Sequence, residues 1–529
     1  MVPMYLWLLS FLNDVVGEKS DFLAQHGDSY GYGMQNFEAF VHRELGQRLK
    51  GDVYLDYAAA GLYTNTQIDA HAEDLKEQLY GNPHSLSSSA QRSSDSVEAA
   101  REAVLEFLGV PKTSSEPEYE VVFTRSCTDS LHLIADMFPW TANRSEYKYL
   151  LQNHNSVLGI RDVARDTSVE ASVVESEKVD DWLDRLATEI DTDDGPLSLF
   201  AYPAEENFAG QIFPLRWSQK IASRQGRLKN WRVLMDAAKF TASHPLNLTE
   251  AQPDFVTLSF YKLFGYPTGV GALVIRSATA SELKKHYWGG GTVSIAGAGR
   301  TASDDVKVFK GRIAEKFEDG TVAFLGIAAL KHGFTALEKV GGMVAIEKHT
   351  SSLASELHHL LLDLKHSNGE QVIAMYSRDR GLDDGRLVQG PVVTFNILET
   401  DGTLISHIEV MADAAKAGIH LRAGMHCNPG AASAKLGLPP EAIAQLAEDP
   451  TTQGCGFGPA FVTCSATAVR QVFDGSCGAE LHTGKPVQQT FGPELWEMPL
   501  GSVRVSLGYL STYEDVQSLV NFIVNKYRK

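Results

Sequence analysis

A lysine and an aspartate stand at the ends of two successive apolar segments. Asp236 closes "WRVLMD" and Lys262 closes "DFVTLSFYK". If both segments are parallel strands, the two side chains emerge at the same edge of a sheet. A carboxylate facing a pyridinium nitrogen and a lysine linked to an aldehyde are the pair that a pyridoxal phosphate enzyme needs. Each residue alone has a plainer explanation, as a lysine reaching solvent from a strand end and an aspartate capping a turn.

Polar residues follow other apolar segments in the same way. Cys127 and Thr128 lie in "TRSCTDS", where backbone N–H groups and the Thr128 hydroxyl would face an anion at a helix N-terminus. His154 follows "YKYLLQN", and Asn207 lies in "EENFAG". The imidazole could stack on a planar cofactor, although a single histidine more often makes an ordinary polar contact. Arg504 interrupts the apolar "GSVRVSLGY", and a buried arginine favours a planar carboxylate as its partner.

Cys427 lies in "GMHCNPGA", five residues after Arg422. A cysteine reacts as the thiolate, and we expect the adjacent His426 and the nearby Arg422 to lower the pKa of this thiol. The Asn-Pro-Gly sequence that follows is typical of a loop tip. The alternative is a small, buried and inert cysteine. The motif by itself leaves both interpretations open.

Apolar strands alternate with helices between residues 51 and 330. This alternation predicts a large α/β domain whose mostly parallel central sheet has helices on both faces. Within it, the periodicity predicts a helix over residues 94–108, ended by Gly109 and Pro111, with Asp95 and Glu98 resembling a capping box at its start. Ligands of such folds bind beyond the carboxyl ends of the strands, which is where the polar residues described above fall.

The pattern changes after residue 330. Long helical periodicity is followed by separate strand-like segments, which predicts a smaller α+β domain over residues 331–529. Residues 1–50 would form an N-terminal extension, beginning with an amphipathic helix. Residues 448–497 show little periodicity and are rich in Gly, Thr and Pro, so we interpret them as a long surface insertion.

The composition is that of a soluble globular protein, with 529 residues, 43% hydrophobic and 21% charged. A formal net charge of −19 argues against binding to nucleic acid or to an anionic membrane. Five cysteines are too few for a disulfide scaffold, and their spacing fits no common zinc site, so no metal is expected. No segment has the length of a membrane span or the features of a secretory signal, so we expect a cytoplasmic protein.

Several motifs occur in an order that resembles a known family. They are "VYLDYAAAG", "NPHS", "DAAKF", "SFYKLFGYPTGVGAL", "WGGGTV", "FEDGT", "CNPGA" and "GSVRVSLGYLST". On these motifs the chain resembles the cysteine desulfurases in the class V aminotransferase group of fold-type I pyridoxal phosphate enzymes. It is most similar to the N-terminal domain of the molybdenum cofactor sulfurases. Lys239 supports this narrower likeness, because ordinary cysteine desulfurases carry a glutamine at the corresponding position.

The resemblance implies a role for each candidate residue. Lys262 would link covalently to pyridoxal 5'-phosphate, Asp236 would face the pyridinium nitrogen, and His154 would stack on the ring. Asn207 would contact the ring hydroxyl or the substrate. The residues implied in phosphate binding or near it are Cys127, Thr128, Ser259 and Tyr261.

The resemblance also implies a partner subunit and a substrate. Thr292 or Thr321 would reach the phosphate of the neighbouring subunit, which implies a homodimer. Arg504 and Arg422 would hold the carboxylate of L-cysteine. Cys427 would attack the sulfur of that substrate, becoming a persulfide and releasing alanine.

The sulfur would pass to a molybdenum cofactor held by an acceptor, which we leave open because the chain stops soon after the desulfurase motifs. A pyridoxal phosphate lyase or decarboxylase of secondary metabolism on the same scaffold is the alternative enzyme. A catalytically silent scaffold or dimerisation partner is a third possibility, against which the intact Lys262, Asp236 and Arg504 speak.

Overall fold

The computed structural model divides the chain into two compact units. It describes residues 18–112, 117–189, 195–379, 381–383, 386–448, 461–465, 489–490 and 495–529. Unit 1 comprises residues 1–59, 206–212 and 340–529, and unit 2 comprises residues 60–205 and 213–339. These limits differ from the predicted domain boundaries at residues 51–59 and 206–212, which belong to unit 1, and at residues 331–339, which belong to unit 2. The segment 206–212 interrupts the large domain. Its assignment has a physical reason, since Phe208 is buried in a cluster of unit 1 with Tyr376 and Leu436.

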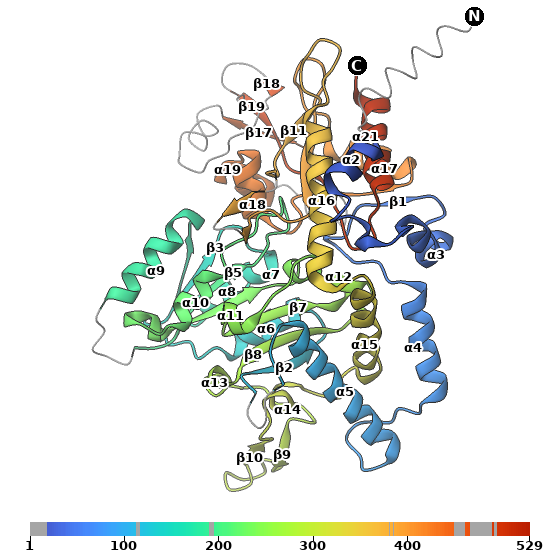
Figure 1. Ribbon diagram of the computed structural model, residues 1–529. Helices are drawn as coiled ribbons and strands as arrows, with labels where there is room; N and C mark the ends of the chain where they lie inside the picture. Colours follow the sequence, from blue (N-terminus) through green and yellow to red (C-terminus); the bar gives the residue numbers. More distant parts are fainter. Residues whose placement is uncertain are drawn as a thin grey trace, which may run out of the picture. The chain divides into compact units, whose positions relative to one another are not determined.

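Unit 2 is built on a seven-stranded sheet of order β2-β8-β7-β6-β5-β3-β4 (Figure 1). Its strands are β2 (Tyr119–Thr124), β3 (Glu146–Leu150), β4 (Glu170–Val174), β5 (Ser198–Pro203), β6 (Trp231–Asp236), β7 (Phe255–Ser259) and β8 (Gly271–Arg276). The pairs from β4 to β7 are parallel, and β8 runs antiparallel to β2 and β7 on either side. The predicted α/β fold with a mostly parallel sheet is confirmed.

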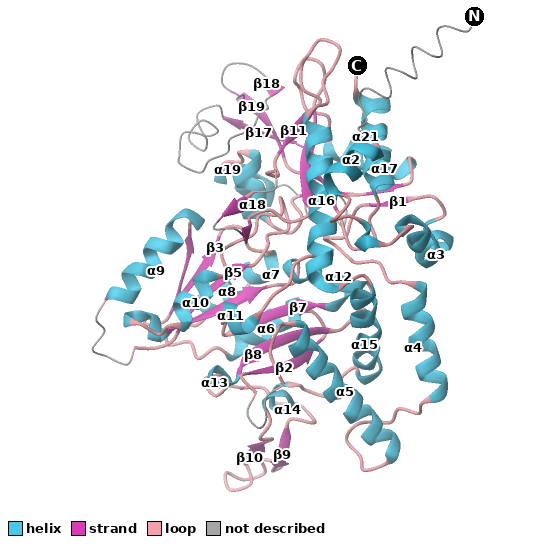
Figure 2. Ribbon diagram, viewed as in Figure 1, coloured by secondary structure: helices cyan, strands magenta, loops and turns pink. Residues whose placement is uncertain are grey.

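Helices pack against this sheet, as Figure 2 shows. The helices of unit 2 include α4 (Asn65–Glu77), α5 (Ser88–Phe107), α6 (Cys127–Met137), α7 (Asn155–Leu158), α8 (Ile160–Asp166), α9 (Val179–Thr188), α10 (Arg216–Ala222), α12 (Phe260–Phe264) and α15 (Phe324–Lys339). Among them, α4 packs against α15. Leu131 and Ile134 of α6 are buried with Tyr147 and Leu199 of the sheet in one apolar cluster. The predicted capping box of α5 is wrong, because the helix starts earlier, at Ser88, and its N-cap is Ser87, whose side chain accepts from the Ala90 N–H.

Unit 1 contains an antiparallel sheet of order β11-β14-β20-β16, which matches the predicted α+β domain. These strands are β11 (Ile373–Met375), β14 (Val392–Ile397), β20 (Ser502–Ser506) and β16 (Arg422–Gly424). A second small sheet pairs β1 (Val53–Tyr54) with β15 (Ile419–His420) in parallel. Asp56, just beyond β1, forms a parallel bridge with Ser506 at the end of β20. This bridge joins the start of the chain to its last strand.

The helices of unit 1 include α2 (Lys19–His26), α3 (Phe37–Leu49), α16 (Gly342–Leu362), α17 (His407–Lys416), α18 (Pro429–Leu436), α19 (Pro440–Glu448) and α21 (Tyr513–Tyr527). The long helical periodicity expected after residue 330 is divided between α15 and α16, because Gly341 and Gly342 both have positive φ angles. Within α16, His349 is fully buried; its Nδ1 accepts from the Gly31 N–H at 3.2 Å and its Nε2 donates to the Ser511 carbonyl at 3.0 Å.

Two predicted segments lie largely outside the described residues. The amphipathic helix expected at the N-terminus falls on residues 1–17, which are not described. Of the insertion expected over 448–497, the structure describes β17 (Phe461–Ser465), β18 (Gln489–Thr490) and the start of β19 (Leu495–Pro499), which form an antiparallel sheet of order β17-β19-β18. Among the helices of the described residues, none combines the length and the apolar character needed to cross a membrane.

Candidate active site

The carboxyl ends of the unit 2 strands bring several predicted residues to one edge of the sheet. Asp236 is the last residue of β6 and pairs in register with Pro203 of β5 and Thr257 of β7. Ser259 ends β7 and lies opposite Gly271, which in turn lies opposite Thr124 at the end of β2. The helices α6, α7 and α12 begin within a few residues of these ends. The parallel order therefore gathers residues that are far apart in the sequence.

The Asp236 carboxylate is buried and held from one side. Its Oδ1 accepts from the Ala238 N–H at 3.1 Å, from the Cys127 thiol at 3.5 Å and from the Thr257 hydroxyl at 3.5 Å. No hydrogen bond ends on its Oδ2 in the described part of the chain. The carboxylate is therefore held in place through one oxygen and can accept a further hydrogen bond through the other. Cys127 thus contributes to the site by holding Asp236, a role that the sequence did not reveal.

Lys262 is half-buried and lies in the short helix α12; the prediction that it ends a strand is wrong, because β7 ends at Ser259. Among the described residues, no hydrogen bond or ion pair involves its Nζ. It belongs to the same electrostatic cluster as Asp236, since both act on the pKa of His154. Burial lowers the pKa of the His154 imidazole, Asp236 opposes this effect and Lys262 adds to it. The His154 Nδ1 accepts from the Ser156 N–H at 3.1 Å, so the ring is neutral and fixed in orientation.

The N-terminus of α6 provides an anion-binding element beside this cluster. Ser126 caps the helix by accepting from the Asp129 N–H at 3.1 Å, and the exposed Thr128 hydroxyl lies 2.9 Å from the Ser156 hydroxyl. A Cβ on Gly271 would come within 2.6 Å of the Ser126 backbone, so this close approach requires glycine. Unsatisfied N–H groups and the helix dipole favour a phosphate at such a position.

The turn that carries Lys262 is also held by close backbone packing. The Gly61 N–H donates to the Tyr261 carbonyl at 2.9 Å. A Cβ on Gly61 would lie 2.9 Å from the Lys262 carbonyl oxygen and 3.1 Å from the Gly265 nitrogen. Gly61 comes from the "VYLDYAAAG" motif, so this motif supports the lysine through its backbone. The Tyr261 side chain is half-buried on α12 next to Lys262, and Ser259 is buried at the strand end.

Lys239 forms a buried ion pair. Its Nζ lies 2.9 Å from Glu205 Oε1 and donates to the Ser243 hydroxyl at 3.2 Å. His244 Nε2 lies 3.7 Å from the other oxygen of Glu205. All these side chains are buried. Glu205 follows β5 and Lys239 follows β6, so the pair lies at the same edge as Asp236.

The two threonines considered for contact with a neighbouring subunit differ in the structure. Thr292 is fully buried, and its hydroxyl donates to the Gly289 carbonyl at 2.8 Å within its own chain. Thr321 is exposed. Of the two, Thr321 has the accessibility that contact with a second molecule requires.

In unit 1, Arg504 is fully buried in the centre of β20. Its Nη1 donates to the Asn207 carbonyl at 2.6 Å and its Nη2 to Asp56 Oδ1 at 3.2 Å. Its Nε makes no hydrogen bond to any described residue. A buried donor without a partner is uncommon, and it is the kind of group that a bound carboxylate would satisfy.

Arg422 lies directly opposite Arg504, on β16. Two like charges facing each other across strands repel, and Asp56 offsets this repulsion. Its carboxylate accepts from Arg422 Nε at 3.1 Å and Nη2 at 2.9 Å while also contacting Arg504. The pKa of Arg422 is raised, chiefly by the hydrogen bond to Asp56 and further by Cys427, which places Cys427 within its electrostatic range. Sequence reasoning missed Asp56, although the motif "VYLDYAAAG" contains it.

Cys427 is exposed and stands immediately before α18. Both His426 and Cys427 have φ of +55°, an unfavourable backbone conformation for residues other than glycine. The Asn-Pro-Gly sequence begins a helix as well as ending a loop, with Asn428 as the N-cap, whose side chain accepts from the Ala431 N–H at 3.2 Å. Two strained residues held next to a helix N-terminus present the thiol at the surface of unit 1.

Asn207 supports this loop. Its side-chain amide donates to the His426 carbonyl, and its own carbonyl accepts from Arg504. The segment 206–212 is in turn organised by Glu206, whose carboxylate accepts from the Phe208 and Ala209 N–H groups, both at 2.7 Å. Asn207 thus connects the arginine with the cysteine loop, a position that its sequence context did not indicate.

The predicted effect of His426 on the thiol is wrong. His426 is buried, and its Nε2 lies 3.3 Å from the Ser502 hydroxyl. Burial lowers the pKa of His426 well below its ordinary value, and Arg504, Arg422 and His407 lower it further. The ring is therefore neutral at neutral pH and supplies no positive charge. Arg422 remains the cation in electrostatic contact with Cys427.

The family follows from comparison with known proteins. The profile of the aminotransferase class-V family matches residues 53–439. The chain belongs to this family. The matched region includes Asp56, His154, Asp236, Lys262 and Cys427.

Curated relatives share the molybdenum cofactor sulfurase name. The molybdenum cofactor sulfurase of Homo sapiens is 37% identical over 94% of this chain and 52% of its own length. That of Oryza sativa subsp. japonica is 36% identical over 96% of this chain and 60% of its own length. The chain thus spans between half and two thirds of the length of these relatives.

Solved structures support the fold. A cysteine desulfurase from Thermococcus onnurineus NA1 matches with a TM-score of 0.65 at 18% identity, over 92% of this chain and 97% of its own. A cysteine desulfurase from Escherichia coli matches with a TM-score of 0.61 at 19% identity, over 92% and 97% of the two chains. The predicted fold-type I architecture is therefore confirmed.

Proposed function

We propose that this protein is a pyridoxal phosphate-dependent L-cysteine desulfurase whose Cys427 receives the sulfur. The observation that carries the proposal is the cluster at the sheet edge of unit 2, where Lys262, Asp236 and His154 interact electrostatically beside the N-terminus of α6. Unit 1 adds the exposed Cys427 and the buried Arg504. The names of the curated relatives and of the solved structures support the same activity.

The residues at this edge fit the cofactor. Lys262 offers an amine without an ion-pair partner in the described part of the chain. Asp236 offers Oδ2 to a protonated ring nitrogen, and the neutral His154 offers a flat ring. Thr128, Ser259 and the N–H groups of α6 suit a phosphate. When bound, pyridoxal phosphate supplies an electron-accepting ring that allows bonds at and next to the substrate α-carbon to break.

The chain's own residues would bind the substrate and move its proton. Arg504 would bind the carboxylate of L-cysteine through its guanidinium group. In the structure, Nη2 of this group donates to Asp56, and Nε has no hydrogen-bond partner among the described residues. Lys262 would hold the cofactor and carry the α-proton of the substrate to the carbon from which sulfur departs. Because Lys262 makes no competing ion pair among the described residues, its amine is available for both tasks.

Cys427 would take the sulfur as a nucleophile. The thiolate attacks the substrate sulfur, a sulfur–sulfur bond forms, and the carbon–sulfur bond breaks. The carbon keeps the electron pair and gains a proton, so the products are alanine and a persulfide on Cys427. L-Cysteine and one thiol account for every atom, and no oxidant or reductant is needed. Arg422 is a cation within electrostatic range of this sulfur.

The test follows both products after incubation with L-cysteine. Wild-type protein should release alanine and show the added mass of one sulfur on the Cys427 peptide. Cys427→Ser should lose that persulfide, whereas Cys464→Ser should keep it. Lys262→Ala should lose the visible absorbance of lysine-bound cofactor as well as alanine release. Formation of pyruvate and sulfide that persists in Cys427→Ser would refute the desulfurase and support the lyase alternative.

We further propose that the sulfur is destined for a molybdenum cofactor, on the strength of the relatives named molybdenum cofactor sulfurase. Cytoplasmic localisation is part of this proposal, and fractionation of cells producing the tagged protein tests it. The sulfur-transfer step is tested by offering the persulfide form to a protein that carries oxo-molybdenum cofactor. The acceptor is first reduced to Mo(IV), so that the metal supplies the two electrons that convert the persulfide sulfur to sulfide; the oxo ligand then leaves as water and the Cys427 thiol is restored. This exchange should fail with Cys427→Ser. Persulfide that never reaches the molybdenum centre would refute this destination.

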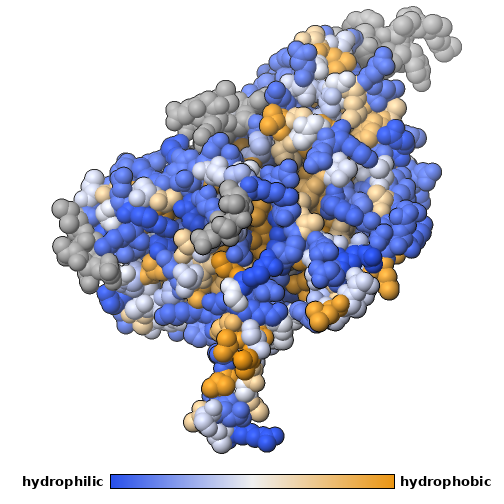
Figure 3. All heavy atoms as spheres, turned by 60° about the horizontal axis from the view of Figure 1, so that its bottom comes forward, coloured by the Kyte–Doolittle hydropathy of each residue, from blue (hydrophilic) through white to orange (hydrophobic). Residues whose placement is uncertain are grey.

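We also propose that the protein acts as a homodimer. The hairpin of β9 (Val293–Ala296) and β10 (Lys307–Phe309) exposes apolar side chains, with Ile295 62% and Val308 52% exposed. Figure 3 shows apolar residues gathered on a projecting arm, which Figure 1 identifies as this hairpin. Exposed apolar patches of this kind mark interfaces, and Thr321 is accessible to a second subunit.

Light scattering coupled to size exclusion tests the dimer. The double variant Ile295→Asp and Val308→Asp should shift the protein to monomer, because each charge would be buried in the interface. Leu86→Asp, at a fully exposed leucine outside the hairpin, serves as the matched control and should remain dimeric. A dimer unaffected by the double variant would refute the hairpin as the interface.

A further inference from the structure

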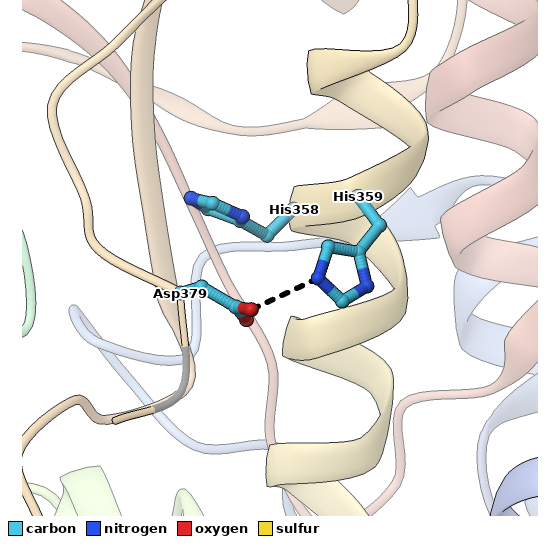
Figure 4. Close-up of side chains that lie close together, drawn as sticks. All are labelled: His358, His359 and Asp379. Atoms are coloured by element: carbon cyan, nitrogen blue, oxygen red, sulfur yellow. Dashed lines mark hydrogen bonds and ion pairs between the residues drawn. The ribbon is translucent and has the colours of Figure 1, made fainter. Parts of the chain in front are cut away.

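Two histidines and an aspartate of unit 1 come together outside the candidate active site. His358 and His359 lie near the end of α16, and Asp379 follows β11. One ring nitrogen of each histidine and one carboxylate oxygen of Asp379 lie within 4.8 Å of one another. Figure 4 shows both rings and the carboxylate grouped beside the helix.

The immediate surroundings fix the orientation of these side chains. His359 Nε2 lies 2.9 Å from Asp379 Oδ2, and the Ser355 hydroxyl donates to Asp379 Oδ1 at 3.3 Å. His358 is buried, and its Nε2 lies 3.4 Å from the Ser377 carbonyl. A carbonyl only accepts, so Nε2 carries the proton and Nδ1 carries the lone pair. A histidine that donates through one nitrogen to a backbone carbonyl is oriented as metal ligands are.

We propose that His358, His359 and Asp379 bind a divalent transition-metal ion of the zinc class. Two imidazole nitrogens and one carboxylate oxygen form a three-ligand set that leaves a position for water. Bonds of about 2.0–2.2 Å place tetrahedral ligand atoms about 3.3–3.6 Å apart. The His359–Asp379 contact of 2.9 Å needs to open only slightly. The exposed side chains of His359 and Asp379 can rotate to close the wider separations.

A simple surface ion pair is the competing explanation, and the chain provides a matched case. His420 Nε2 lies 3.0 Å from Asp52 Oδ2, with side chains exposed to about the same extent as those of His359 and Asp379. Among the described residues, this second pair has no third metal-ligating residue in the same cluster. The buried His358 is therefore what distinguishes the proposed site. A metal there would also join α16 to the segment after β11, so it should stabilise the fold.

Zinc sulfate titrated into the full-length protein tests this site by calorimetry and by thermal unfolding. All variants carry Cys427→Ser, so that the exposed thiol does not bind zinc. His359→Ala and Asp379→Asn change exposed residues and keep the fold, whereas the buried His358 is left intact. Each should weaken one zinc site at least ~10-fold and abolish the thermal stabilisation by zinc. His420→Ala should bind and be stabilised like the parent protein.

X-ray absorption at the zinc edge identifies the ligands of the site that these variants lose. Nitrogen and oxygen neighbours with imidazole scattering are expected. Sulfur in that site would overturn the assignment, as would zinc binding in His359→Ala and Asp379→Asn that matches His420→Ala. These readouts do not involve the desulfurase reaction, so they stand or fall separately from the proposed function.

Discussion

Replacing Asp56 by asparagine should expose how strongly the buried arginine depends on its counter-charge. Arg504 is 1% exposed, and among the described residues Asp56 is the acidic side chain bonded to it, at 3.2 Å. Breaking a buried ion pair from one side costs about 3–5 kcal/mol. Asparagine keeps an oxygen that can accept from one guanidinium N–H, so the loss should fall near 3 kcal/mol, the lower end of that range. The half-exposed Arg422 should add less than about 1 kcal/mol.

Equilibrium urea unfolding measures this loss, with the m-value compared to confirm that the transition itself is unchanged. Asp52→Asn is the matched control. Asp52 lies four residues before Asp56 and forms a half-exposed ion pair with His420. That control should cost no more than about 1 kcal/mol. A loss in Asp56→Asn as small as in the control would refute the reasoning. It would mean that Arg504 is stabilised by backbone carbonyls and not by the carboxylate.

Three further predictions concern burial and close packing. Burial lowers the pKa of His349 to about 3, so the unfolded chain binds the proton first on acidification. Stability should fall by up to about 1.4 kcal/mol for each pH unit below about 6.5, and His349→Gln should flatten this decline in urea unfolding. Gly61→Ala should displace the Lys262 turn and lower cofactor absorbance, whereas Gly311→Ala, where a Cβ meets no atom within 4 Å, should not. Lys239→Met should destabilise by about 3 kcal/mol in urea, and the double variant with Glu205→Gln should recover part of that loss.

Each of these predictions has a result that contradicts it. Identical slopes of stability against pH in His349→Gln and wild type would show that another group titrates. Equal cofactor absorbance in both glycine variants would show that the Lys262 turn tolerates displacement. Additive losses in the double variant would show that Lys239 and Glu205 do not interact.

The alternation of apolar segments was sufficient to predict the large sheet and the residues at its edge. Asp236 ends the buried strand β6, and Lys262 follows the end of the buried strand β7 in α12; neighbouring parallel strands place such ends together. The strand that carries Arg504 could be predicted equally well. A lone arginine in an apolar segment also indicates a buried side chain that needs a partner. Local periodicity is a property of consecutive residues, so it can be recognised without knowledge of the fold.

The start of α5 was less predictable. Asp95 and Glu98 have the spacing of a capping box, yet the helix begins seven residues earlier at Ser88. Serines are poor helix formers in isolation but are carried into a helix when its apolar face packs, as Ala90 and Val97 do here. Tertiary burial thus overrode the local signal.

What the sequence determined by itself was the set of chemically capable residues, their order along the chain and the family to which they belong. Only the tertiary structure decided their states. It buries His426 and so removes its charge, turns Cys127 toward Asp236, and places Asp56 between Arg422 and Arg504. These outcomes depend on desolvation and on contacts between residues hundreds of positions apart. The spacing of neighbouring residues encodes neither the desolvation nor these long-range contacts, because both arise only when the chain packs.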